Sequence, residues 1–162
     1  FLLTNLLIPR LIESAPSRII NVSSGGMYSQ RLSISNLQND QGEYKGSAAY
    51  ARTKRGQVIL TEMWAEQLAD KGVTVSSMHP GWADTPGVAK SLPGFYKLTK
   101  PILRTAAEGA DTIVWLAAAA EASETGRFWH DRRARPIHKT RRTREGIEAR
   151  RELWEALTTL TE

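Results

Sequence analysis

Two short apolar runs enclose one long helical pattern, and this succession limits the fold more than any other feature of the chain. The first run covers residues 18–23 and the second covers 73–78. In the first run, Ile19, Ile20 and Val22 are nearly continuous, as expected for a parallel strand that is covered on both faces, and the second run reads as another strand. The helical pattern between them extends from Tyr50 to about Asp70. A strand, a helix and a second strand in this order predict an α/β fold with a parallel sheet.

Tyr50 and Lys54 open the helical pattern and are four residues apart, so a helix places them on one face. An ammonium group beside a phenol favours the ionised phenol, so the pair is suited to proton transfer. The alternative is an ordinary solvated helix face, because Tyr and Lys often meet at this spacing by chance. The pair therefore indicates a catalytic site only if other segments of the chain support it.

Both strands end in residues that suit a binding site. Two serines and two glycines at 23–26 follow the first strand, and a Pro80-Gly81 turn follows the second. Thr85 lies four residues after that turn. Each hydroxyl also has an ordinary structural role available, because Ser24 could cap a strand end and Thr85 could form a turn.

The serine-bearing strand end, the Tyr-x-x-x-Lys helix and the Pro-Gly-x-x-x-Thr loop, in this order, resemble the short-chain dehydrogenase/reductase (SDR) family. The longer runs 22–28 and 78–88 resemble one subgroup of it, called SDR family member 12. The resemblance implies the C-terminal half of a Rossmann-type doubly wound parallel sheet, without the N-terminal strands and their Gly-rich turn.

The resemblance also implies an oxidoreductase that uses NAD or NADP and acts on a hydrophobic ketone or alcohol. Three residues would be catalytic. Ser24 would hydrogen-bond the substrate oxygen, Tyr50 would exchange the proton, and Lys54 would favour the phenolate. Ser24 is chosen over Ser23 by alignment with the family, and neighbours on a strand end face opposite ways.

Five residues would bind the cofactor: Tyr50, Lys54, Pro80, Gly81 and Thr85. Lys54 would bind the ribose of the nicotinamide half, and Pro80 and Gly81 would form the floor under the nicotinamide. Thr85 would hold the carboxamide. The cofactor itself carries the redox chemistry.

Part of such an enzyme has no counterpart in this chain. Members of the family run to roughly 250 residues or more, whereas the chain has 162. The pyrophosphate-binding turn, the residue that selects NAD or NADP, and the catalytic Asn are absent, and Asn5 does not replace the last. We therefore expect an N-terminally truncated chain that is inactive by itself.

The chain divides into two parts on its composition. Residues 1–130 are expected to form the C-terminal part of the Rossmann domain, and residues 131–162 a basic tail with a terminal amphipathic helix at about 145–160. Residues 88–104 mix Pro, Gly and apolar residues, which is typical of an active-site lid or of a surface connection. An apolar lid favours a hydrophobic substrate.

The positive charge of the chain is concentrated near its end. The net charge is +5, but residues 127–151 hold ten basic and three acidic residues, so they carry +7 and the rest carries −2. Nucleic acid is an unlikely partner, because aromatic residues do not interleave with these charges beyond Trp129. A solvated tail is the preferred interpretation.

Other features limit the remaining classes of function. The chain has no cysteine, which fits a reducing, cytoplasmic location. Its three histidines lack metal-ligand spacing, so no metal is expected. No apolar run is long enough for a transmembrane segment. The resemblance leaves a homo-oligomer open as a partner state, because the helix that carries Tyr50 often forms a dimer contact in the family.

Two further hypotheses compete with the oxidoreductase. The first is a non-catalytic binding protein derived from the SDR family, which keeps the old site residues. The second is a nucleic-acid binder that uses residues 127–151 and whose affinity falls steeply with salt.

Overall fold

A four-stranded sheet forms the centre of the computed structural model, which describes residues 1–91 and 93–162. The strands lie in sequence order, β1–β2–β3–β4, and the first three are parallel. Their bounds are Ser17–Val22 for β1, Val73–Met78 for β2, Arg127–His130 for β3 and Arg133–Arg135 for β4. The predicted α/β fold and its parallel strands are confirmed. The sequence did not predict β4, which turns back and pairs antiparallel with β3.

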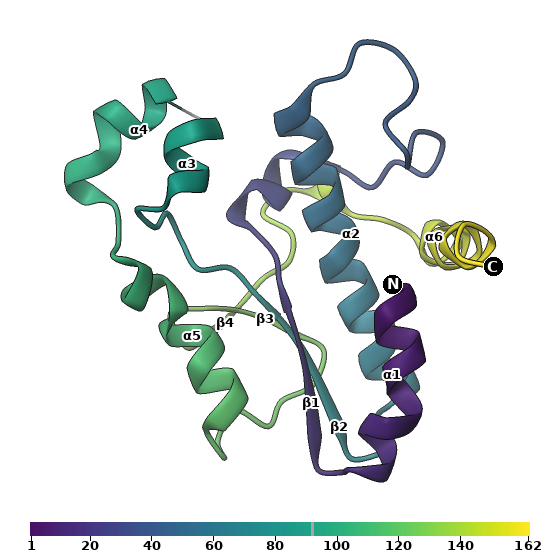
Figure 1. Cartoon of the computed structure of the whole chain (residues 1–162). Helices are drawn as coiled ribbons and strands as arrows, with labels where there is room; N and C mark the ends of the chain where they lie inside the picture. Colours follow the sequence, from purple (N-terminus) through teal and green to yellow (C-terminus); the bar gives the residue numbers. More distant parts are fainter. Residues whose placement is uncertain (92) are drawn as a thin grey trace.

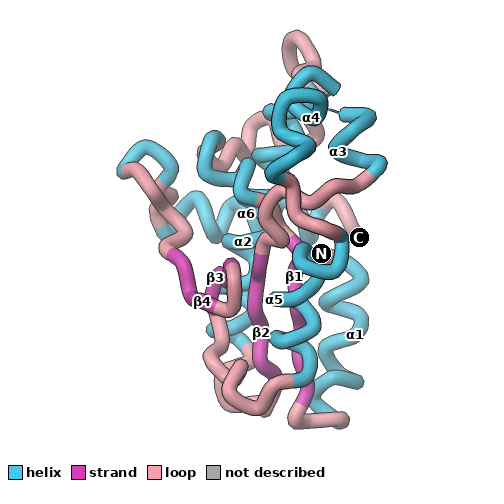
Figure 2. The backbone as a smooth tube through the Cα atoms, turned by 90° about the vertical axis from the view of Figure 1, so that its left-hand side faces the viewer, coloured by secondary structure: helices cyan, strands magenta, loops and turns pink. Residues whose placement is uncertain are grey.

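Helices cover both faces of the sheet, as Figures 1 and 2 show. Helices α1 (Leu2–Glu13) and α2 (Gly46–Gln67) lie on one face, and α5 (Ala106–Ala118) lies on the other. Arg18 of β1 joins the sheet to α5, because its guanidinium donates to the carbonyl oxygens of Leu116, Ala119 and Ala122 at the end of that helix. This two-sided covering explains why β2, the strand between β1 and β3, is buried at every position except Thr74.

The core lies between α2 and the sheet. The predicted apolar stripe of α2 is buried, with Val58 and Ile59 fully inaccessible and Trp64 nearly so. The indole N–H of Trp64 donates to Asn5 Oδ1 on α1 at 2.9 Å, so Asn5 has a structural role. Trp64 therefore belongs to the core.

Two helix boundaries differ from the sequence-based prediction. Helix α2 begins at Gly46 with Lys45 at its N-cap position, four residues before the start at Tyr50 that the sequence pattern indicated. The helix ends at Gln67, several residues before Gly72. Gly72 instead leads into β2 at φ +69°, where a Cβ atom would lie 2.9 Å from the Cβ of Ala15. Positive φ and close approach together explain a glycine there.

Irregular segments and short helices lie at the carboxyl ends of the parallel strands. The 3₁₀ helix η1 (Gly25–Ser29) follows β1 directly. After β2 come three short pieces: α3 (Pro86–Ser91), α4 (Pro93–Thr99) and the 3₁₀ helix η2 (Lys100–Ile102). They occupy most of the predicted lid, in which Leu92 lies outside the described residues. Figure 1 shows α3 and α4 projecting from the body beside the upper end of α2.

The basic C-terminal segment returns to the body of the molecule. After the 3₁₀ helix η3 (Arg141–Thr143), helix α6 (Ile147–Thr159) packs against α2. Leu153 is buried, and Trp154 contacts Phe1 and Trp64 edge to face. A terminal helix was predicted over 145–160, and the structure has it at Ile147–Thr159, docked on the domain.

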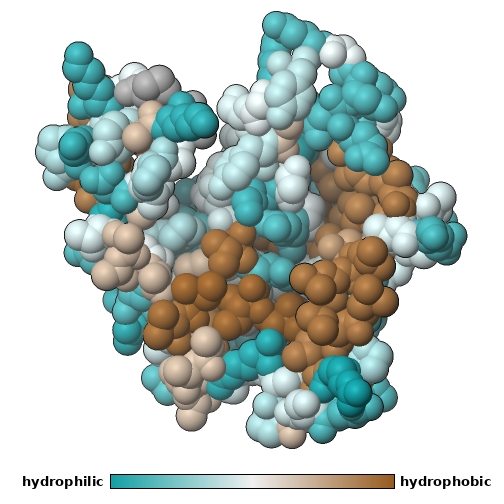
Figure 3. All heavy atoms as spheres, in the orientation of Figure 1, coloured by the Kyte–Doolittle hydropathy of each residue, from teal (hydrophilic) through white to brown (hydrophobic). Residues whose placement is uncertain are grey.

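Part of the molecular surface is strongly apolar. Figure 3 shows brown residues gathered over the lower half of the face on which α1 lies. Leu3 and Leu6 of α1 are 70% and 67% exposed. Val22 is also exposed and ends β1, which pairs with β2 on one side and forms the edge of the sheet on the other. Among the described residues, no helix is both long and apolar enough to cross a membrane.

Candidate active site

The end of β1 places two neighbouring serines in different environments. Ser23 is buried, and its hydroxyl donates to the carbonyl oxygen of Lys54 at 2.8 Å. Ser24 is partly exposed, and its Oγ accepts the backbone N–H of Gly26 at 3.1 Å, which caps η1. The Ser23 hydroxyl is therefore committed to α2, whereas the Ser24 hydroxyl keeps its own proton to donate.

Tyr50 and Lys54 lie together on the first half of α2. The Lys54 ammonium is 5.5 Å from the centre of the Tyr50 ring, and Tyr50 is 53% exposed. Lys54 also donates to the carbonyl oxygen of Val22 at 2.9 Å and to Gln57 Oε1 at 3.1 Å. Burial lowers the pKa of the Lys54 ammonium below its usual value. The pair thus lies against the carboxyl end of β1, next to Ser24.

The turn after β2 carries Pro80 and Gly81. Gly81 adopts φ +78°, and a Cβ atom there would lie 3.1 Å from the guanidinium of Arg104. Its N–H donates to Nδ1 of His79 at 3.2 Å. Arg104 also donates to the carbonyl oxygen of Pro80 at 3.4 Å. The turn is therefore braced on both sides, by a histidine and by an arginine.

Thr85 lies at the start of α3. Its Oγ1 accepts the backbone N–H of Val88 at 3.4 Å, so the residue caps this short helix. The structure thus gives Thr85 the turn-forming role that was the alternative to binding. Among the described contacts, none joins Thr85 to Tyr50 or Lys54. The structure brings Tyr50, Lys54 and the Ser23–Ser24 strand end together and leaves Thr85 on a separate segment.

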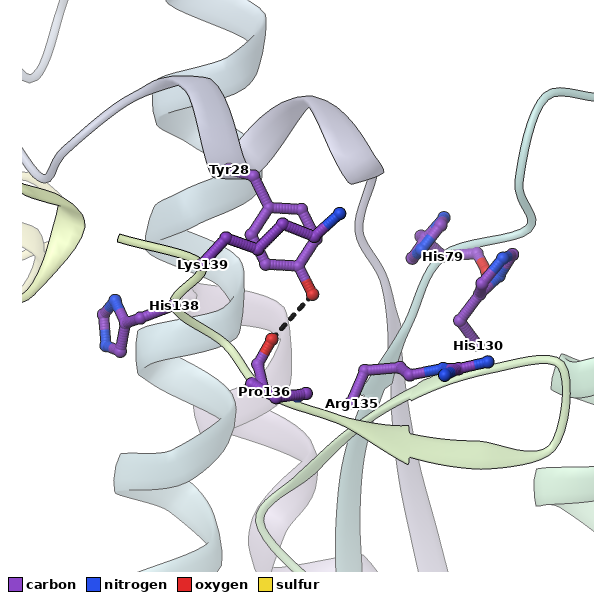
Figure 4. A pocket seen from close by; sticks show the side chains of 7 residues that line it. All are labelled: Tyr28, His79, His130, Arg135, Pro136, His138 and Lys139. Carbon is purple, nitrogen blue, oxygen red and sulfur yellow. Dashed lines mark hydrogen bonds between the residues drawn. The ribbon is translucent and has the colours of Figure 1, made fainter. Parts of the chain in front are cut away.

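Sequence reasoning missed a cavity of about 480 Å³ beside these loops. All three histidines of the chain line it, together with Tyr28 and the basic side chains of Arg135 and Lys139 (Figure 4). His79 and His130 stack with ring centres 3.9 Å apart. A usable signal was present, since each of these two histidines stands at the carboxyl end of a parallel strand and β2 and β3 are neighbours.

The His79 ring is neutral at neutral pH. Burial, followed by the neighbouring His130, lowers the pKa of His79 to about 4. Because Nδ1 accepts the Gly81 N–H, the neutral ring carries its proton on Nε2. Among the described residues, no group of three His, Cys, Asp or Glu side chains could hold a metal ion.

A second feature that was missed is a buried cation next to Lys54. Arg55 is fully buried, and its guanidinium donates to the carbonyl oxygen of Ile137 at 2.8 Å and contacts His138 Nδ1 at 3.3 Å. Burial lowers the pKa of Arg55, and the nearby Glu145 opposes this effect. The helix that carries Tyr50 and Lys54 is thereby tied to the C-terminal segment. A charged residue on the apolar face of the helix was the signal in the sequence.

Comparison with known proteins identifies relatives that match most of the chain. The chain is 46% identical to human dehydrogenase/reductase SDR family member 12 over 85% of its length, and this covers 44% of the human protein. It is 36% identical to mouse retinol dehydrogenase 11 over 72% of its length, which covers 37% of that protein. The chain thus spans less than half the length of both relatives. The resemblance of runs 22–28 and 78–88 to family member 12 is confirmed.

Solved structures show the same fold. A protein of unassigned function from Mycobacterium paratuberculosis superposes with a TM-score of 0.64 at 21% identity, covering 90% of this chain and 50% of its own. The 3-oxoacyl-[acyl-carrier protein] reductase of Brucella melitensis gives a TM-score of 0.55 at 26% identity, and the match covers 75% of this chain and 43% of the reductase. Residues 1–94, more than half of the chain, match the model of the short chain dehydrogenase family. The chain therefore belongs to the short-chain dehydrogenase/reductase family.

Proposed function

We propose that the native protein is an NAD- or NADP-dependent oxidoreductase of the short-chain type that acts on a hydrophobic ketone or alcohol. One observation carries the proposal. The exposed Tyr50 phenol lies beside the Lys54 ammonium, whose Nζ binds the last carbonyl of β1 next to Ser24. An acid or base, a cation and a hydroxyl donor are thus grouped around the carboxyl end of β1.

The residues present fit the nicotinamide half of such a cofactor. An ammonium group has three N–H donors, and the contacts of Lys54 with Val22 and Gln57 use two, so one remains for a ribose hydroxyl. The guanidinium of Arg104 packs closely against Gly81, so the Pro80–Gly81 turn is held in one shape and would present its backbone to the nicotinamide. The Thr85 hydroxyl accepts one bond and keeps its proton to donate to a carboxamide oxygen. When bound, the cofactor supplies or takes the hydride.

The chain's own residues then handle the proton. During reduction of a ketone, Tyr50 gives its proton to the carbonyl oxygen, on which negative charge builds. Ser24 donates its hydroxyl to the same oxygen, because its Oγ already accepts from Gly26. During oxidation of an alcohol, the Tyr50 phenolate takes the hydroxyl proton, and the Lys54 ammonium stabilises that phenolate.

Two observations support a hydrophobic substrate. Leu98 and Ile102, in the segment after β2 that also carries Thr85, are 83% and 81% exposed and offer apolar surface. The relatives are named as a retinol dehydrogenase and a 3-oxoacyl-[acyl-carrier protein] reductase, which favours an alcohol or a ketone as the reacting group.

The pyrophosphate half of the cofactor needs residues that this chain does not contain. The chain contains no Gly-x-Gly-x-x-Gly turn, and the relatives are more than twice as long as their matched part. We propose that a preceding part of the native protein binds the pyrophosphate and selects NAD or NADP. It would pair with the free edge of β1 and cover the exposed leucines of α1.

Replacing Tyr50 with Phe tests this function. Tyr50→Phe keeps the ring but removes the only proton that the phenol can transfer, so kcat for carbonyl reduction should fall by roughly 100- to 10,000-fold. The measurement is the oxidation of NADH or NADPH by the native protein with a panel of apolar ketones and aldehydes. Tyr44→Phe is the matched control, because Tyr44 lies in the loop before α2 and is 70% exposed.

The outcomes separate the two classes of function. If Tyr50→Phe turns over as fast as the wild type, the assignment of Tyr50 is wrong. If the wild-type native protein oxidises neither coenzyme with any carbonyl compound, the alternative of a non-catalytic binding protein derived from the family is favoured.

Three coarser expectations belong with this proposal and stay predictions. The division into a Rossmann part at 1–130 and a basic tail at 131–162 is one, although β4 and its pairing with β3 lie across that boundary. A cytoplasmic location rests on the lack of cysteine. Self-association is the third.

A further inference from the structure

The cavity beside the candidate active site shares a wall with it. His79 is that wall, because its Nδ1 binds the N–H of Gly81 and its ring lies 3.5 Å from where a Cβ atom of Gly25 would stand. Gly25 is the next residue after Ser24. Figure 4 shows the rings of His79 and His130 on one side of the cavity and Tyr28 on the other. A molecule held near Ser24 therefore has the cavity within reach.

The cavity is lined by positive charge without an internal counter-charge. Arg135 and Lys139 line it, and no acidic side chain does. Two carboxylates lie beside lining histidines, Asp131 at 3.4 Å from His130 Nε2 and Glu145 at 3.8 Å from His138 Nε2. Arg104 holds Asp131 with both terminal nitrogens at 2.5 and 2.9 Å, and Arg150 lies 3.5 Å from Glu145. Among the ion pairs of the described residues, none includes Arg135 or Lys139, so two cations face the cavity while the neighbouring carboxylates have other arginines as partners.

The walls between these cations are flat and largely apolar. The hydroxyl of Tyr28 donates to the carbonyl oxygen of Pro136 at 2.6 Å, so its polar atom is occupied. The Lys139 ammonium lies 4.5 Å from the centre of the Tyr28 ring, a cation–π distance. His79 also stacks on Phe128, with ring centres 5.5 Å apart. Aromatic faces and two cations together suit a molecule with a carbon chain and an anionic end.

We infer that the substrate is a carbonyl or alcohol compound with an anionic group, which binds between Arg135 and Lys139 in this cavity. The anion is a carboxylate or a phosphate, since both accept hydrogen bonds from guanidinium and ammonium groups. The carbon chain passes the His79 ring and brings the reacting oxygen toward Ser24 and Tyr50. The inference rests on the proposed function and makes its hydrophobic substrate amphipathic.

A series of oxo acids and their methyl esters tests the inference. The native protein is assayed with 5-oxohexanoate through 11-oxododecanoate and with each ester, which differ only in the charge at one end. At a chain length that spans the two sites, kcat/KM should be about tenfold or more higher for the acid than for the ester. Arg135→Gln should lower this acid-to-ester ratio about tenfold. Arg142→Gln removes the same charge from the exposed part of the basic segment and should leave the ratio unchanged.

Each other outcome has a distinct meaning. Equal efficiency for acids and esters at every length overturns the inference and leaves the proposed function standing. If Arg135→Gln lowers kcat/KM for acid and ester by the same factor, the inference is also overturned, because Arg135 then has a structural role only. If no compound is turned over, the proposed function fails, and calorimetry then decides whether the wild type binds the acids and Arg135→Gln does not.

Inorganic phosphate distinguishes a free anion from the anionic end of a substrate. Phosphate alone should compete with the acids but bind far more weakly, because it lacks the carbon chain. If it binds as tightly as the best acid, the cavity is a site for free anions and the inference is wrong.

Discussion

The ring of His79 lies between the candidate active site and the cavity next to it. Its Nδ1 accepts the N–H of Gly81, and its face stacks on His130. Asp131, Arg104 and Lys139 are the other charged groups that act on it. Protonation of His79 would place a proton on Nδ1 and remove the acceptor for Gly81. The ring therefore needs to stay neutral for the turn after β2 to keep its shape.

This arrangement predicts acid sensitivity. The pKa of His79 is about 4 in the folded protein and near 6.5 when unfolded. Between these values the unfolded chain binds a proton that the folded chain does not, so stability is complete above about pH 6.5 and falls toward pH 4. Urea unfolding at several pH values should show a midpoint that decreases across this window.

His79→Asn provides the comparison for that experiment. Its Oδ1 can accept the Gly81 N–H, but the side chain does not titrate. The midpoint of the variant should depend less steeply on pH between 6.5 and 4. An identical slope in both proteins would show that other groups cause the acid sensitivity, such as His138, whose pKa burial also lowers.

At the residue scale, spacing predicted the close pair correctly and missed the cavity. Tyr50 and Lys54 are four residues apart on one helix, so their proximity follows from helix geometry alone. His79 and His130 are 51 residues apart and meet only because β2 and β3 pair in parallel. The catalytic and cofactor-binding roles of Ser24, Tyr50, Lys54, Pro80, Gly81 and Thr85 stay predictions.

Helix α2 is the element that joins the candidate site to the rest of the molecule. Its upper half carries Tyr50 and Lys54, and its buried Arg55 binds the C-terminal segment at Ile137 and His138. Farther along, Glu62 forms an ion pair with Arg150 of α6. The C-terminal segment, which also carries Arg135 and Lys139, is thus held in place by polar contacts with α2.

Removal of Arg55 should loosen this connection. Arg55→Met keeps much of the side-chain volume but leaves buried carbonyl oxygens without their donor, so the free energy of unfolding should fall by about 3 kcal/mol. Trypsin should also cleave faster within 141–144. Urea unfolding and limited proteolysis measure these effects. Arg52→Met, on the same helix but half-buried, should change stability by less than about 0.5 kcal/mol. Equal stability of both variants would contradict the role of Arg55.

Regular periodicity predicted whole helices and strands well, whereas local sequence signals did not predict where a helix starts or how a short strand pairs. The long helices and the strands with apolar runs were predicted, since their patterns repeat over many residues. The helix start at Gly46 and strand β4 were not predicted. The residues of β4 are an alternation of Arg and Ala whose pairing depends on where β3 already lies.

At the scale of the whole molecule, one face carries a gathered apolar surface (Figure 3). The exposed leucines of α1 and the unpaired edge of β1 lie on that face. A contiguous apolar surface of this kind marks a place that another protein surface covers. In the 162-residue chain by itself, the available cover is a second copy.

The double variant Leu3→Glu/Leu6→Glu should therefore reduce self-association of the isolated chain. Both leucines are about two-thirds or more exposed, so the substitution should cost little stability in the monomer. Sedimentation equilibrium measures the weight-average mass. Ile147→Glu is the control, because Ile147 is 88% exposed and belongs to α6, not to α1. An unchanged mass in the double variant would place the contact elsewhere.

The sequence by itself determined the order of the elements, the α/β class and the pairing of Tyr50 with Lys54. These follow from local periodicity and from motifs that identify the family, and both are readable along the chain. The tertiary structure decided that the three histidines share one cavity with Arg135 and Lys139. It also decided that Arg55 is buried and that the leucines of α1 are exposed. Such facts depend on which distant segments the sheet and its helices bring together, and no local pattern contains that information.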